Sequence, residues 1–128
     1  MVIAEDEALI RLDLAEMLAE EGYEVVGQAS DGRQAIDLAE ELRPDLVITD
    51  VIMPRLNGYE LCERLKSDET TRSIPVVMVT VRAGDRDQRQ GSSAGADAYL
   101  IKPFHLTELK ATIDQLLPPG ERPSPTAG

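Results

Sequence analysis

Five short runs rich in Val and Ile alternate with longer stretches whose apolar residues recur at helical spacing, and this alternation constrains the fold most. The runs lie at 2–4, 24–29, 45–49, 75–80 and 98–101. The third and fourth are apolar almost throughout, which indicates strands buried on both faces, as in a parallel sheet. Strands joined by crossovers of helical length predict an α/β fold of the (βα)5 type. We therefore expect a doubly wound parallel sheet of five strands with helices on both faces.

The stretches between these runs carry the spacing and the start signals of helices. Apolar residues recur at helical spacing from Leu9 to Leu18 and again from Leu106 to Leu117. Asp31 is followed three residues later by Gln34, which predicts a helix start of the capping-box type, and Asn57 and Glu60 bracket the start of the next helix. The stretch at 84–95 occupies the place of the fourth helix but has almost no large apolar side chain. A marginal, mobile helix is predicted there.

The composition narrows the class of protein. A chain of 128 residues fits one compact domain, expected at 1–117, followed by a Pro-rich, disordered tail or linker at 118–128. A formal net charge of −11 opposes direct binding to nucleic acid and to anionic membranes. The longest apolar run is too short to span a bilayer. The single cysteine, Cys62, rules out an internal disulfide and lies on an apolar helix face. We therefore expect a soluble cytoplasmic protein with Cys62 in its core.

Polar side chains follow four of the five predicted strands. The first strand is followed by Glu5 and Asp6, the third by Asp50 and the fifth by Lys102, and the fourth ends on Thr80. The carboxyl ends of parallel strands share one edge of the sheet, where open α/β sheets bind their ligands. We therefore expect these five side chains to lie close together.

The chemistry of this set points to phosphoryl transfer. Three carboxylates held together stay ionised only if a cation joins them, and oxygen ligands of this kind favour Mg²⁺, with Mn²⁺ as a substitute. Lys102 would balance the charge of an incoming phosphoryl group, and Thr80 would donate a hydrogen bond to it. A carboxylate can itself be the nucleophile and form an aspartyl phosphate. Asp50 is the best candidate because it lies at the central acidic strand end.

The order of these motifs resembles the receiver domain of bacterial two-component response regulators, the CheY-like family. The resemblance rests on "EDE" at 5–7, "DVIMPRLNG" at 50–58, Thr80 closing "VVMVT", and "GADAYLIKPF" at 95–104, and it covers about residues 1–117. It implies the strand order 2-1-3-4-5. It also implies a signalling phosphoacceptor that catalyses only its own phosphorylation and dephosphorylation, without being an enzyme for an external substrate.

The resemblance assigns a role to each matching residue of the predicted site. Asp50 would take a phosphoryl group from a sensor histidine kinase or a phosphotransfer protein. Glu5, Asp6 and Asp50 would hold Mg²⁺ together with the backbone carbonyl of Ile52. Lys102 would pair with the phosphate, and the bond that follows it, to proline, would be cis.

The resemblance also implies a switch and partners for it. Thr80 would move toward the phosphoryl group, and Tyr99 would change rotamer with it. This would alter the face made by helix 4, strand 5 and helix 5, which would bind a downstream protein and could form a homodimer on phosphorylation. An output domain outside this sequence is the other possible target. The cognate kinase and the output are not readable from the sequence.

Two residues depart from the family's usual pattern. Val81 stands where the family usually has a small residue, so its side chain is expected to slow access to the pocket. His105 is read as a surface residue.

Two other functions compete with that of a phosphoacceptor. A phosphatase of the haloacid dehalogenase type would carry a second Asp where this chain has Ile52, so that alternative ranks low. An unphosphorylated docking module is the third possibility; the intact acidic cluster argues against it, whereas Val81 and the weak fourth helix leave it open.

Overall fold

The computed structural model describes residues 1–53, 55–81 and 95–117. Five parallel strands form one sheet in the order β2-β1-β3-β4-β5, as the sequence predicts. The strands are β1 (Val2–Ala4), β2 (Gly27–Ala29), β3 (Val47–Asp50), β4 (Val76–Thr80) and β5 (Ala98–Ile101). In the register, Val2 of β1 lies opposite Gly27 on one side and Val47 on the other. β1 therefore lies inside the sheet between β2 and β3.

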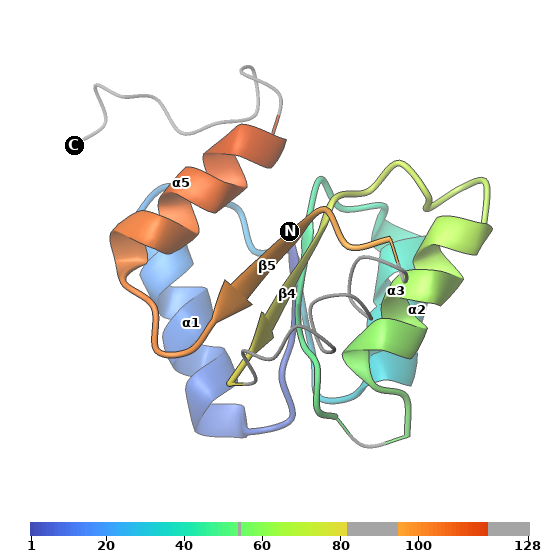
Figure 1. Cartoon of the computed structure of the whole chain (residues 1–128), viewed down its shortest axis with the longest axis horizontal. Helices are drawn as coiled ribbons and strands as arrows, with labels where there is room; N and C mark the ends of the chain where they lie inside the picture. Colours follow the sequence, from blue (N-terminus) through green and yellow to red (C-terminus); the bar gives the residue numbers. More distant parts are fainter. Residues whose placement is uncertain (54, 82–94, 118–128) are drawn as a thin grey trace.

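The helices cover both faces of the sheet. They are α1 (Ala8–Glu20), α2 (Gly32–Leu42), α3 (Gly58–Ser67) and α5 (Leu106–Leu116). Figure 1 shows α1 and α5 on one side of the sheet and α2 and α3 on the other. Adjacent strand residues serve opposite faces, since Val47 belongs to the core under α2 and α3 and Ile48 to the core under α1 and α5. This explains why the central strands are apolar at every position rather than at alternate ones.

Three strands have different bounds from those expected, and the smallest difference is at β4, which begins at Val76 rather than at residue 75. β2 begins at Gly27 rather than at residue 24, because its partner β1 begins at Val2, which lies opposite Gly27 in the register. β3 begins at Val47 rather than at residue 45, for the same reason, and it includes Asp50 as its last residue. The acid is therefore held by the hydrogen-bonded ladder of the sheet instead of following it.

The helix-start signals work largely as predicted. The Asn57 side chain accepts a hydrogen bond from Glu60 N at 2.9 Å, and the Glu60 carboxylate accepts one from Asn57 N at 3.3 Å. The Asp31 side chain likewise accepts a bond from Gln34 N at 2.8 Å. The Gln34 side chain accepts its bond from Ser30 N instead of Asp31 N, so only half of the predicted capping box forms at α2.

The remaining structural predictions concern Cys62, the segment 84–95, the tail at 118–128 and membrane-spanning helices. Cys62 is buried, and its burial raises the pKa of the thiol to about 11, so its predicted core position is confirmed. The segment 84–95 lies outside the described residues except for Gly95, as does the tail at 118–128. Within the described ranges, none of the helices has the length and apolar character needed to cross a membrane.

Candidate functional site

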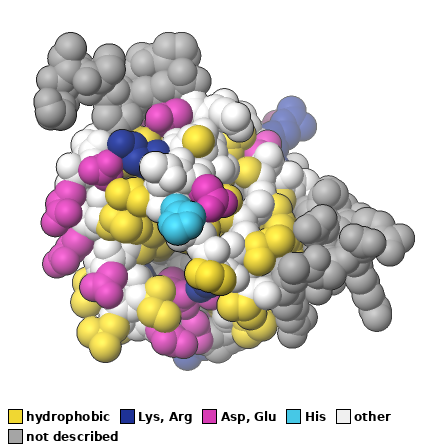
Figure 2. All heavy atoms as spheres, turned by 60° about the vertical axis from the view of Figure 1, so that its left-hand side comes forward, with side chains coloured by type: hydrophobic (Ala, Val, Ile, Leu, Met, Phe, Trp, Pro, Cys, Tyr) yellow, Lys and Arg dark blue, Asp and Glu magenta, His cyan; other side chains and the backbone are white. Residues whose placement is uncertain are grey.

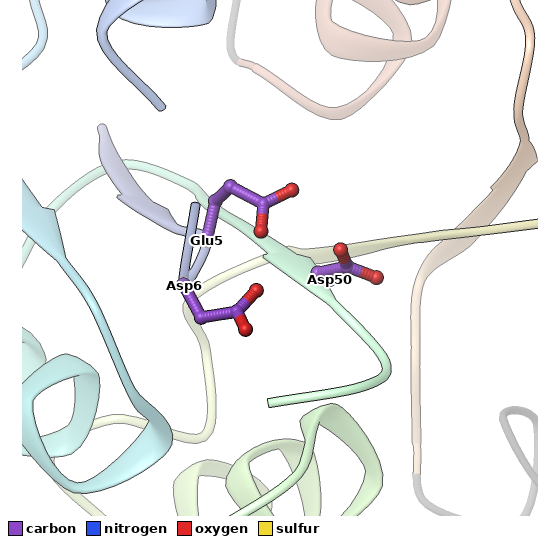
Figure 3. Close-up of side chains that lie close together, drawn as sticks. All are labelled: Glu5, Asp6 and Asp50. Carbon is purple, nitrogen blue, oxygen red and sulfur yellow. The ribbon is translucent and has the colours of Figure 1, made fainter. Parts of the chain in front are cut away.

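Three carboxylates meet at the carboxyl edge of the sheet. Glu5 and Asp6 follow β1, and Asp50 ends the neighbouring strand β3. One oxygen from each residue lies within 4.8 Å of the others, and Figure 3 shows the three side chains gathered at this edge. Glu5 is buried, Asp50 is half-buried and Asp6 is exposed, so the cluster opens to solvent on the Asp6 side. All three members offer oxygen ligands, and the cluster could hold a hard divalent cation.

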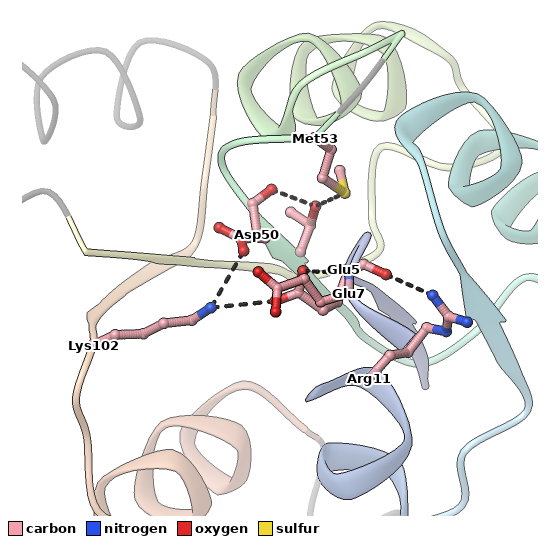
Figure 4. A network of polar contacts seen from close by, with 7 residues as sticks. Glu5, Glu7, Arg11, Asp50, Met53 and Lys102 are labelled. Atoms are coloured by element: carbon pink, nitrogen blue, oxygen red, sulfur yellow. Dashed lines mark hydrogen bonds and ion pairs between the residues drawn. The ribbon is translucent and has the colours of Figure 1, made fainter. Parts of the chain in front are cut away.

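Lys102 supplies a positive charge to this cluster. Its Nζ lies 3.2 Å from Asp50 Oδ2 and 3.3 Å from Glu5 Oε1, and Figure 4 shows the ammonium reaching both carboxylates. The backbone N–H of Lys102 donates to Thr80 O at 2.7 Å, which ties the residue after β5 to the end of β4. The peptide bond from Lys102 to Pro103 is cis, as expected.

The pKa values of Lys102 and Asp6 are both raised above their ordinary values. Burial disfavours the charged form of Lys102, but the Asp50 and Glu5 carboxylates outweigh this effect and raise the pKa of Lys102 above its ordinary value. The pKa of Asp6 is also raised, because its carboxyl shares a hydrogen bond with Glu5, is partly desolvated and lies near the Glu5 charge. A proton therefore competes with a metal ion for Asp6.

The backbone on either side of the cluster is tightly held. A Cβ at Gly58 would lie 2.5 Å from Asp50 O, so only glycine allows this approach of α3 to the end of β3. Gly58 N donates to Val51 O at 2.9 Å, and the Thr49 hydroxyl donates to Asp50 O at 3.0 Å. On the β1 side, the Arg11 guanidinium donates to Glu5 O at 2.8 Å, as Figure 4 shows.

Sequence reasoning missed both of these supporting residues. Gly58 belongs to the quoted motif "DVIMPRLNG", and a glycine directly after a helix cap is a signal that a close backbone approach is needed. Arg11 lies on α1 six residues after its partner Glu5, and nothing local in the sequence announces that contact.

The predicted switch residues lie on neighbouring strands. Thr80 is buried and ends β4, one residue beyond Val79, which lies opposite Asp50 in the register. Tyr99 lies opposite Met78 within β5 and packs, partly buried, against the core under α2 and α3. Thr80 thus lies one strand away from Asp50, and Tyr99 lies on β5, the outer strand beyond it.

Three further residues named from the sequence lie at the surface. Ile52, two residues after Asp50, is 52 % exposed, and Val81, next to Thr80, is 68 % exposed. His105 is exposed as predicted and is the cyan side chain in Figure 2, where acidic side chains gather along one border of the same face.

A cavity of about 80 Å³ adjoins the cluster on the α1 side. Asp50, Glu5 and Lys102 form its polar part. Its remaining walls are apolar and come from Ala4, Ile10, Leu14, Ile48, Val79 and Phe104. Apolar side chains therefore border the ion pairs of Lys102 on the α1 side.

Comparison with known proteins agrees with this geometry. A family model described as the response regulator receiver domain matches residues 1–114. The chain belongs to this family. It is 49 % identical over 114 residues to the transcriptional regulatory protein PdtaR of Mycobacterium tuberculosis, a match that covers 89 % of this chain and 54 % of PdtaR. The chain thus spans about half the length of the curated relatives it matches.

Solved receiver domains share the fold. The signal receiver domain of a signal transduction histidine kinase from Syntrophus aciditrophicus superposes with a TM-score of 0.84 at 35 % identity, covering 91 % of this chain and 87 % of that one. The chemotaxis protein CheY4 of Vibrio cholerae gives a TM-score of 0.84 at 31 % identity, covering 91 % and 96 %. The predicted receiver-domain family and its strand order are therefore confirmed.

Proposed function

We propose that Asp50 of this receiver domain accepts a phosphoryl group in a Mg²⁺-dependent reaction. The observation that carries the proposal is the position of Asp50 between two further carboxylates and one ammonium group. A carboxylate with a cationic partner and a metal-binding neighbourhood is equipped to attack phosphorus and to balance the charge that arrives with it.

The residues present fit a divalent cation that prefers oxygen. Glu5, Asp6 and Asp50 would hold Mg²⁺, or Mn²⁺ as a substitute, and the backbone carbonyl of Ile52 would complete the protein ligands. The bound metal would neutralise the phosphoryl oxygens during transfer. Glu5 is held for this role by the bond from Arg11 to its backbone oxygen, and Asp50 is held by the ladder of β3.

The transfer step is a displacement at phosphorus. An Asp50 carboxylate oxygen forms the new P–O bond while the P–N bond of a phosphohistidine breaks, and the departing imidazole nitrogen keeps the electron pair and takes up a proton. The Lys102 ammonium, which now pairs with Asp50, turns to the phosphoryl oxygens. Water later attacks the same phosphorus, restores the Asp50 carboxylate and releases phosphate. The domain therefore changes only itself and turns over no external substrate.

Phosphorylation would act through the neighbouring strands. The Thr80 hydroxyl moves toward the phosphoryl group, and Tyr99 changes rotamer in the space this movement leaves. The face that includes β5 and α5 then changes its affinity for a partner. The partners are a sensor histidine kinase or phosphotransfer protein as donor, and a downstream protein, an output domain or a second copy as target. The cytoplasmic location, the 1–117 domain limit and the absence of direct nucleic-acid contact stay predictions.

The test uses a small phosphodonor and two variants. Intact-mass measurement after incubation with acetyl phosphate should show one phosphoryl adduct that requires Mg²⁺ and disappears in Asp50→Asn. Asp37→Asn, which removes an exposed carboxylate on α2, is the matched control and should keep the adduct. An adduct that persists in Asp50→Asn would place the acceptor elsewhere. A folded wild type that binds Mg²⁺ but forms no adduct would favour the docking-module alternative.

A further inference from the structure

Two arginines adopt a left-handed backbone conformation that residues other than glycine rarely adopt. Among the described residues other than glycine, only Arg43 and Arg55 have positive φ, at 46° and 68°. Arg43 ends α2, where a left-handed residue is a common helix terminus. Arg55 lies in the loop between β3 and α3, five residues after Asp50. A residue other than glycine keeps such a backbone conformation only where its surroundings fix it.

The Arg55 side chain forms an ion pair with a buried acid. Arg55 Nη1 lies 2.9 Å from Asp31 Oδ2, and Asp31 is only 6 % exposed at the start of α2. The other oxygen, Oδ1, accepts the hydrogen bond from Gln34 N, so both carboxylate oxygens are used. The backbone N–H of Gln34 and then the Arg55 charge outweigh the opposing effect of burial and lower the pKa of Asp31, which keeps it ionised.

A second contact joins the same loop to the same helix end. A Cβ at Gly32 would lie 2.1 Å from Leu56 O, so α2 and the loop touch through backbone atoms at the residues next to the ion pair. Three side chains of this loop are also buried, those of Val51, Met53 and Leu56. The loop after Asp50 is thus fastened to α2 at two consecutive positions.

The loop is also fastened where it leaves the sheet. Val51 N donates to Val79 O at 3.1 Å, and Gly58 N donates to Val51 O at 2.9 Å. Residues 52–54 lie between this end and the contact with α2, and the structure describes two of them, Ile52 and Met53. The conformation of these two residues, and with it the direction of the backbone carbonyls that follow Asp50, is therefore set from both sides.

We propose that the ion pair between Arg55 and Asp31 is a positioning device that presets the divalent-cation site. It holds the loop so that the Asp50 carboxylate and the backbone carbonyl two residues later face the cation without rearrangement. Groups that orient metal ligands typically change metal affinity by about 10- to 100-fold when removed. The inference rests on the proposed function only for the identity of the metal site.

The exposure of Arg55 separates positioning from stability. The Arg55 side chain is 73 % exposed, and ion pairs with an exposed partner contribute little to folding free energy. Replacement by glycine also relieves the backbone conformation. Removing the side chain should therefore weaken metal binding while leaving the melting temperature of the metal-free protein nearly unchanged.

The experiment measures the Mg²⁺ dissociation constant of the unphosphorylated full chain by calorimetry, together with its metal-free melting temperature. Arg55→Gly should weaken Mg²⁺ binding by about 10-fold. Arg43→Gly, the matched arginine with positive φ at the far end of α2, should bind as the wild type does. Asp31→Asn keeps an oxygen for Gln34 N but loses the charge, and should match Arg55→Gly. The double variant should bind no more weakly than either single variant, because both remove one interaction.

Each contrary result has its own meaning. A Mg²⁺ affinity within about twofold of wild type in Arg55→Gly overturns the positioning role, as do additive losses in the double variant. A loss that tracks a lowered melting temperature overturns it too, in favour of a structural role. If Arg55→Gly fails to fold, Asp31→Asn and Arg55→Lys carry the test, and Lys should recover part of the affinity. A wild type that binds no Mg²⁺ overturns the metal site itself, whereas failure of Asp50 phosphorylation leaves this result unaffected.

Discussion

The Lys102 ammonium lies 3.2 Å from the carboxylate of Asp50, although 52 residues separate the two in sequence. The Lys102 ammonium, which would later balance the charge of a phosphoryl group, thus already balances the charge of the Asp50 carboxylate. In this state Lys102 and a divalent cation compete for the same carboxylate. Removing the Lys102 ammonium is therefore expected to change metal binding and phosphorylation in opposite directions.

Replacing Lys102 by Gln should strengthen Mg²⁺ binding but slow phosphorylation. Loss of the ammonium leaves the acidic cluster more negative, so Mg²⁺ affinity should rise by about 3- to 10-fold. The phosphoryl group then lacks its cationic partner, and the rate with acetyl phosphate should fall by about 10²-fold. Calorimetry and intact-mass kinetics measure the two effects. Lys110→Gln, which removes the ion pair with Glu21 on another part of the molecule, should change neither. A loss of both properties in Lys102→Gln would contradict competition.

Replacing Asp6 by Asn should stabilise the metal-free protein at neutral pH. The pKa of Asp6 is above its ordinary value of 3.8 in the folded state, so the native state holds this proton to a higher pH than the unfolded chain does. Stability therefore falls as pH rises through the interval between the two pKa values, and the full cost is present at neutral pH. Asn removes that cost.

Thermal melting with and without Mg²⁺ checks this prediction. Without metal, Asp6→Asn should melt above wild type at pH 7, and the difference should shrink as pH falls below the pKa of Asp6. With Mg²⁺ in excess, wild type should gain stability that the variant largely lacks. A variant that melts below wild type without metal would show that Asp6 stabilises the fold rather than straining it.

Replacing Gly58 by Ala should damage the site through the backbone. Its Cβ would lie 2.5 Å from Asp50 O and 3.0 Å from Val51 Cα, and backbone atoms cannot move aside as the end of a flexible side chain can. We expect a loss of about 1–3 kcal/mol in the free energy of unfolding and weaker Mg²⁺ binding. Gly27→Ala is the control, since its Cβ would meet only side-chain carbons of Leu38, Leu42 and Val2, the nearest at 3.3 Å. Chemical denaturation of both variants decides the matter, and equal small losses would remove Gly58 from the support of the site.

Parallel topology made the acidic cluster predictable. Glu5, Asp6, Asp50 and Lys102 each follow or end a recognisable strand, and strands that run the same way deliver these side chains to one edge. Local sequence was sufficient because the register of the sheet then brings the side chains together. The contact between Arg55 and Asp31 had no such signal, since the partners lie in two loops and meet only after packing.

The first helix shows where periodicity was insufficient. Apolar residues surround α1, so spacing alone did not show which of them face the sheet. Ala15 and Leu18 are buried, whereas Leu9, Ile10 and Leu12 stay largely exposed. The direction of the core is set by the sheet and by α5, which packs beside α1, and neither can be read from the helix itself.

The link between the acceptor and β5 gives the last prediction. Thr80 is buried at the end of β4, next to the strand that carries Tyr99. Thr80→Val keeps the shape of the side chain but removes the hydroxyl that would follow the phosphoryl group. Beryllofluoride with Mg²⁺, a stable mimic of the phosphoryl group, should therefore still bind at Asp50 but should no longer shift the NMR signals of Tyr99.

The control for this prediction is another buried threonine. Thr71→Val loses the hydroxyl bond to Leu65 O and should cost about 1 kcal/mol of stability, yet it should leave the Tyr99 shifts intact. Beryllofluoride-induced shifts at Tyr99 that are as large in Thr80→Val as in wild type would mean that the signal reaches β5 by another route. Lys102 then becomes the connecting residue, because its backbone N–H already bonds to Thr80 O and its side chain already contacts Asp50.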